Sequence, residues 1–193
     1  MIRLILISIL FSCSISAQTN VIKVHESTMV WDENRPLTWE DYQGKVDEKI
    51  IAHAATAYKI EIVPENVLVD EADRIQSYKN LTVVANFYKN ESWTMSASTI
   101  LLEHERLHVD IAEIFARKIR RRFRELQLLE EARFSVYFQE YSVLWKECMA
   151  FQKRFEKETE NGRVEQMNKV WAKKVKEMLN ELSDYKSNLV VRN

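Results

Sequence analysis

The second half of the sequence repeats apolar side chains at helical spacing with almost nothing to interrupt the pattern. From Ser96 onward, apolar residues recur every three or four positions, and they do so again after the break ETENGR at residues 158–163. The 193-residue chain has two glycines and two prolines, and of these four residues only Gly162 lies in this half. Because glycine and proline are the strongest helix interruptions, the pattern predicts long helices before Gly162 and a last helix from Val164 to Leu182.

Two shorter segments ahead of the helices alternate apolar and polar residues as β-strands do. Residues 55–63, ATAYKIEIV, place Tyr58, Ile60 and Ile62 on one face. Residues 81–89, LTVVANFYK, form the second such segment, and the polar loop between the two favours an antiparallel pair. The predicted fold class is therefore α+β, with a small antiparallel sheet followed by a helical half.

The N-terminal residues have the pattern of a secretory signal peptide. One positive charge precedes an apolar run from Leu4 to Phe11, and small residues follow at Ser16 and Ala17. We expect cleavage after Ala17, so that residues 1–17 are a signal peptide and residues 18–193 a single exported domain, periplasmic or secreted. The alternative is a lipoprotein at the cell envelope, because LFSC loosely resembles a lipobox ending at Cys13. Membrane attachment is expected only if Cys13 is lipidated.

The charge balance gives no indication of a nucleic-acid partner. The chain has 28 basic and 29 acidic residues, whereas nucleic-acid-binding domains carry a basic excess. The basic run at residues 117–124 is interpreted as a solvated helix face. Cys148 lies in an apolar helical pattern and is expected to be a buried core residue without chemistry.

The segment LLEHERLHVDIAEIFAR, residues 101–117, contains the spacing of a zinc site. His104 and His108 are four residues apart, so on a helix both imidazoles lie on one face and can bind one metal ion. Both share an apolar stripe with Leu107 and Ile111, which points them inward. The alternative is a pair of core histidines that are satisfied by hydrogen bonds without a metal.

Glu105 is placed for acid–base chemistry and not for metal binding. It is rotated by about 100° from His104, beside the expected metal position. A carboxylate there can take a proton from water that attacks a peptide carbonyl and return it to the leaving amine. The expected substrate is therefore a peptide or protein.

The residues near the histidine pair do not supply an obvious third ligand. Asp110 and Glu113 lie about 160° and 140° around the helix from His108, on other faces. The remaining histidines, His25 and His53, could reach the pair only through the tertiary fold.

Four segments resemble a known family of secreted zinc-dependent proteases, domain of unknown function 922. These are RPLTWEDYQG, AHAATAY, VVANFYKNESW and above all LLEHERLHVDIAEIFARKIR. The resemblance implies a zincin-like helical half and zinc-dependent proteolysis. The family often has the pattern ET, any residue, HG at its C-terminal break, where this chain has Asn161 before Gly162. If the family histidine is the third ligand, Asn161 is a poor substitute, and Glu158 and Glu160 become the carboxylate candidates.

The sequence therefore predicts an exported zinc metallopeptidase with His104 and His108 as metal ligands and Glu105 as general base. One zinc ion per chain is expected. The competing prediction is a non-catalytic, envelope-associated binding protein that retains a degenerate metal-site helix.

Overall fold

The computed structural model describes residues 21–23, 25–49, 51–64 and 67–192. The predicted signal peptide and Cys13 lie outside these residues. Three α-helices in these residues follow every strand but the last, namely α1 (Thr99–Leu128), α2 (Phe134–Thr159) and α3 (Glu165–Glu181). None of the helices in the described residues is long and apolar enough to cross a membrane.

The main sheet is antiparallel, with β5 (Thr82–Tyr88) between β2 (Thr28–Val30) and β4 (Tyr58–Val63). Two small pairs accompany it. β3 (Ala54–Ala55) pairs antiparallel with β6 (Trp93–Thr94), and β1 (Val21–Lys23) pairs in parallel with β7 (Val190–Arg192). Short 3-10 turns lie at Trp39–Asp41, Tyr78–Asn80, Lys89–Glu91 and Ser183–Tyr185.

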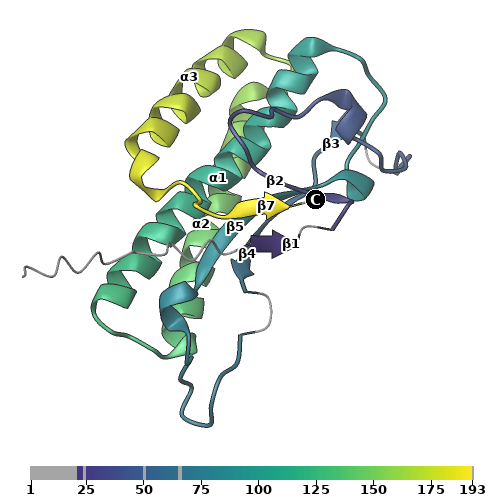
Figure 1. Ribbon diagram of the computed structural model, residues 1–193. Coiled ribbons are helices and arrows are strands. Elements are labelled where there is room, and N and C mark those ends of the chain that lie inside the picture. The colour runs from purple at the N-terminus through teal and green to yellow at the C-terminus, as the bar shows by residue number, and fades with distance from the viewer. Residues whose placement is uncertain (1–20, 24, 50, 65–66, 193) are drawn as a thin grey trace, which may run out of the picture.

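α1 is the central element of the fold. It runs diagonally across the molecule and packs against β4 and β5 as well as against both other helices (Figure 1). Ser98 caps its first turn, because the hydroxyl oxygen accepts the backbone N–H of Leu101. Residues from Ile111 to Ile119 include six apolar side chains that are at most 2% exposed, so the middle of α1 is covered on nearly all sides.

The predicted α+β class, with a small antiparallel sheet before a helical half, is confirmed. Both predicted strands are present, at Tyr58–Val63 and Thr82–Tyr88, and they pair antiparallel. β5 is buried on both faces, not on one, because Val84 and Asn86 on the second face are also only 2% and 7% exposed. Cys148 is fully buried, as expected.

The basic run of α1 is solvated only in part, because Arg121 and Arg124 are exposed, whereas two other arginines are buried. Arg117 and Arg120 are only 1% and 8% exposed. Both guanidinium groups contact Oε1 of the buried Glu113, at 2.8 Å from Arg117 Nε and 2.5 Å from Arg120 Nη2. They also donate to main-chain carbonyls of Leu179 and Tyr185, so the cluster fixes the end of α3 and the segment that follows.

Candidate functional site

His104 and His108 lie on the face of α1 that packs against α2. Their side chains are almost completely buried, and the two ring centroids are 5.0 Å apart. Phe155 of α2 covers both rings, at centroid distances of 4.5 Å from His104 and 5.0 Å from His108. The pair therefore points inward, as the helical pattern predicts.

Glu156 of α2 completes the pair. Its Oε2 lies 3.3 Å from His104 Nε2, and its Oε1 lies 3.1 Å from His108 Nε2. The possible ligand atoms of the three residues lie within 4.8 Å of one another. The fold thus brings two imidazole nitrogens and one carboxylate together from two helices, which is the donor set of a His, His, Glu zinc site.

The far side of each imidazole is held by an amide whose orientation is fixed. Asn168 Oδ1 lies 3.1 Å from His104 Nδ1, and its Nδ2 donates to the Gly162 carbonyl at 2.8 Å. Gln152 Oε1 lies 2.7 Å from His108 Nδ1, and its Nε2 donates to the His108 carbonyl at 2.8 Å. Since each amide oxygen can only accept, each Nδ1 carries a proton and each Nε2 is directed toward Glu156, so that Nε2 is the atom that would bind a metal once it has lost its own proton.

The side chains fit a metal ion in two further respects. Glu156 Oε2 is buried and makes no hydrogen bond among the described residues, although His104 Nε2 lies 3.3 Å away, and a buried carboxylate oxygen is costly unless a donor or a cation pairs with it. The nitrogen–oxygen separations of 3.3 and 3.1 Å are close to the roughly 3.3 Å that separates ligands of a tetrahedral zinc with bonds of about 2.0 to 2.1 Å.

The charges at the site reinforce one another. Burial alone would raise the pKa of Glu156, but the contacts with His104 and His108 outweigh it and lower this pKa to about 2. Burial alone would lower the pKa of His108, but the contact with Glu156 and the negative charge of Glu105 outweigh it, so the net shift is upward. The site therefore favours positive charge between the two carboxylates.

Glu105 lies beside the three clustered residues and contacts none of their ligand atoms by hydrogen bonding in the described structure. It is 5% exposed, and its Oε2 accepts a hydrogen bond of 2.5 Å from the Thr56 hydroxyl. The Thr56 hydroxyl donates to Oε2 and not to Oε1 of Glu105. Glu105 is not among the three residues whose possible ligand atoms cluster.

The residues considered as a third ligand lie elsewhere. Glu158 accepts a hydrogen bond from Trp171 at 2.9 Å and contacts Arg154, whereas Glu160 and Asn161 are exposed turn residues. Asp110 accepts from Trp31 at 2.7 Å on another face of α1. His25 and His53 are exposed and, with Glu113, are outside the cluster.

Glu156 itself was not among the sequence candidates, although α2 carries a usable signal. Gln152 and Glu156 are four residues apart and fall among the buried positions Cys148, Phe155 and Thr159. A carboxylate in an otherwise buried helical stripe needs a compensating charge. That requirement could have indicated Glu156 before the structure was known.

Gly162 gives the His104 ring its space. This residue has a φ of +80°, and a Cβ at its position would lie 2.9 Å from His104 Cγ. Glu160 and Asn161 also have positive φ, at 50° and 54°, so the chain turns back from α2 through three left-handed residues. The turn explains why glycine is needed directly beside the candidate metal centre.

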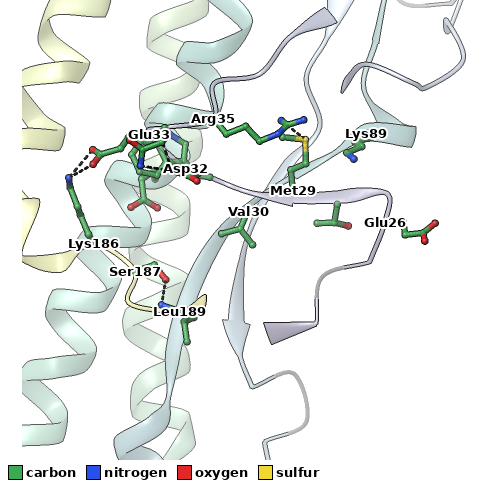
Figure 2. A pocket seen from close by; sticks show the side chains of 14 residues that line it. Glu26, Met29, Val30, Asp32, Glu33, Arg35, Lys89, Lys186, Ser187 and Leu189 are labelled. Atoms are coloured by element: carbon green, nitrogen blue, oxygen red, sulfur yellow. Dashed lines mark hydrogen bonds and ion pairs between the residues drawn. The ribbon is translucent and has the colours of Figure 1, made fainter. Parts of the chain in front are cut away.

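Two hollows lie away from the histidines, on the side of α1 that faces Trp31. One has a volume of about 730 Å³ and lies between β2 and the C-terminal segment, where Lys186 contacts Glu33 (Figure 2). The other, about 350 Å³, is lined mainly by apolar residues of α1, α3 and the segment after β2. Neither hollow includes a residue of the His104, His108 and Glu156 cluster.

No protein-family model matches the sequence, and no curated protein or solved structure shows significant similarity to it. The resemblance to the domain of unknown function 922 family therefore rests on the four sequence segments alone.

Proposed function

We propose that the protein is an exported zinc-dependent metallopeptidase whose ligands are His104, His108 and Glu156. The observation that carries this proposal is the convergence of these three side chains from α1 and α2, with Glu105 beside them. The resemblance to the secreted zinc-dependent proteases supports the same activity. The signal-like N-terminus supports export to the periplasm or the medium.

The chain would divide the chemistry among six side chains. His104, His108 and Glu156 would hold the ion, while Asn168 and Gln152 accept from Nδ1 of the two histidines and so direct Nε2 toward it. Zinc supplies Lewis acidity, which makes water nucleophilic near neutral pH and polarises a carbonyl. Glu105 accepts the proton of the attacking water at its carboxylate and passes it to the leaving amine of the peptide.

A second candidate is a metal-binding protein without catalysis. It is favoured by the low exposure of the site, because His104, Glu105 and His108 are 2%, 5% and 8% exposed. Structural zinc sites are closed, whereas catalytic sites keep a position open to substrate. Zinc content alone does not separate the two candidates, but peptide hydrolysis does.

Purified protein without its signal peptide is expected to bind about one zinc per chain, which elemental analysis after zinc-supplemented expression measures. Alanine at His104, His108 or Glu156 should each remove most of the metal, because two remaining ligands hold zinc poorly. Alanine at the exposed His53 is the matched control and should leave the zinc content unchanged. Full zinc content in the Glu156→Ala protein would exclude Glu156 as a ligand.

Gly162→Ala is expected to weaken zinc binding by about 10- to 100-fold, the usual effect of disturbing a residue that orients a metal ligand. The added methyl group would push against the His104 ring, which also stacks on Phe155 at a centroid distance of 4.5 Å. Competition with a chromophoric chelator measures the affinity. Gln166→Ala, an exposed substitution on α3, serves as the control, and equal affinities of the two variants would contradict the role of Gly162.

A further inference from the structure

A chain of two hydroxyl groups ends on the Glu105 carboxylate. The Thr56 hydroxyl donates to Glu105 Oε2 at 2.5 Å, and the Tyr42 hydroxyl lies 2.9 Å from the Thr56 oxygen. A carboxylate only accepts hydrogen bonds, so the Thr56 hydroxyl donates its proton to Glu105. The Thr56 oxygen therefore accepts from the Tyr42 hydroxyl. Burial raises the pKa of Tyr42, so its phenol keeps that proton.

The backbone around Thr56 is fixed on both sides. β3 ends at the preceding residue and is paired with β6, and it contacts α1. On the following side, Ala57 donates its N–H to the Ser92 hydroxyl at 2.9 Å and accepts from the Tyr88 N–H at 2.9 Å. Ser92 is completely buried and donates to the Tyr88 carbonyl at 2.7 Å. Thr56 is therefore held by the ends of β5 and β6.

The side chain and the backbone of Tyr42 are also held in place by their neighbours. Its ring is 8% exposed and packs against Trp39 and Phe87 at centroid distances of 4.9 and 5.1 Å. Two residues on, Gly44 donates its N–H to the Ser92 carbonyl at 2.7 Å, and a Cβ there would lie 2.8 Å from that oxygen. The segment that carries Tyr42 is thus held against the same residue that holds Thr56.

We propose that Thr56 is the positioning residue for Glu105, with Tyr42 holding the Thr56 hydroxyl in turn. The inference rests on the proposed function, because it assigns a role to Thr56 through Glu105. It also assigns one common role to three segments that supply no metal ligand, namely LTWEDYQG, AHAATAY and NESW. They hold one oxygen of the carboxylate so that the other is presented beside the histidine pair.

The orientation matters because a proton acceptor works only within hydrogen-bond reach of the proton it takes. Valine has the shape of threonine without the hydroxyl, so Thr56→Val removes the donor and leaves Glu105 Oε2 unpaired in a nearly closed site. The carboxylate is then expected to turn toward another partner. Thr56→Ser keeps the hydroxyl and should restore the contact.

The first measurement is structural and does not require activity. In crystal structures of the zinc-loaded protein, the Glu105 carboxylate should keep its contact in Thr56→Ser and leave its position in Thr56→Val, with zinc present in both. Tyr42→Phe removes one oxygen further along the chain and should shift the Thr56 rotamer. An unmoved carboxylate in Thr56→Val would overturn the proposal, whether or not the protein proves to be a peptidase.

The second measurement uses a single peptide selected from a library that the wild type cleaves. Thr56→Val is expected to lower kcat by about 10- to 100-fold with little change in KM and zinc content, and Thr56→Ser to recover most of the loss. In a Glu105→Gln background, Thr56→Val should have no further effect. Thr28→Val on β2 is the control for a threonine without such a contact.

A loss that serine does not rescue, or that persists in full without Glu105, would mean that Thr56 acts only through stability. Absence of cleavage by the wild type would count against the proposed function and leave the structural measurement to decide the role of Thr56.

Discussion

Glu105→Gln is expected to lower peptide hydrolysis by about 10²- to 10⁴-fold, which is the contribution of a general base. Glutamine has nearly the size of glutamate and its amide oxygen can still accept the Thr56 hydroxyl, so the buried site should remain folded. The amide cannot take a proton from the attacking water. Zinc content should be unchanged, because Glu105 is not one of the three clustered residues. Cleavage of a mixed peptide library, followed by mass spectrometry, measures the loss.

Glu103→Gln is the matched control, since Glu103 lies on the exposed face of α1 two residues earlier. This variant should cleave like the wild type. Equal cleavage by Glu105→Gln and the wild type would refute the role of Glu105. If neither protein cleaves while both hold zinc, the metal-binding function without catalysis becomes the better explanation.

Glu113→Ala is expected to destabilise the fold by about 3 to 5 kcal/mol, the usual cost of removing one partner of a buried ion pair. The carboxylate contacts both Arg117 and Arg120, which are themselves almost fully buried. Without it, both guanidinium groups would lose their carboxylate contact in the core. Urea unfolding should show a lower midpoint with an unchanged slope.

Glu125→Ala on the same helix provides the comparison. Glu125 contacts Arg122 at 2.8 Å, but both side chains are at least 40% exposed, and exposed pairs contribute at most about 1 kcal/mol. A similar shift of the urea midpoint in the two variants would contradict the buried cluster. The experiment is independent of zinc, because Glu113 is outside the metal cluster.

Those parts of the fold that depend on local patterning could be predicted from the sequence. The alternation in residues 55–63 and 81–89 predicted both main strands, and the four-residue spacing of His104 and His108 predicted their shared inward face. In each case the pattern lies within one helix or strand, where the spacing of apolar residues along the sequence determines which side chains share a buried face. The convergence of these elements on one site is a property of the tertiary fold.

The features that were missed depend on contacts between distant segments. The charge pattern at residues 117–124 is that of a solvated helix, and Arg117 and Arg120 are buried only because Glu113 and carbonyls after α3 accept their N–H groups. Glu156 meets the histidines because α2 packs antiparallel to α1, which fixes its height along that helix. The family motif directed attention to residues 158–161, whereas the side chain that reaches the site lies half a turn earlier in α2.

The division of the cluster between two helices has a mechanical consequence. An ion held by His104 and His108 of α1 and by Glu156 of α2 would cross-link the two helices. In terms of chain entropy, such a cross-link closes the long stretch of sequence between His108 and Glu156 into a loop. Anything that binds the native chain and not the unfolded one shifts the folding equilibrium by mass action. Zinc bound at this position would therefore make the folded chain harder to unfold, and so harder to digest by proteases that attack the unfolded chain.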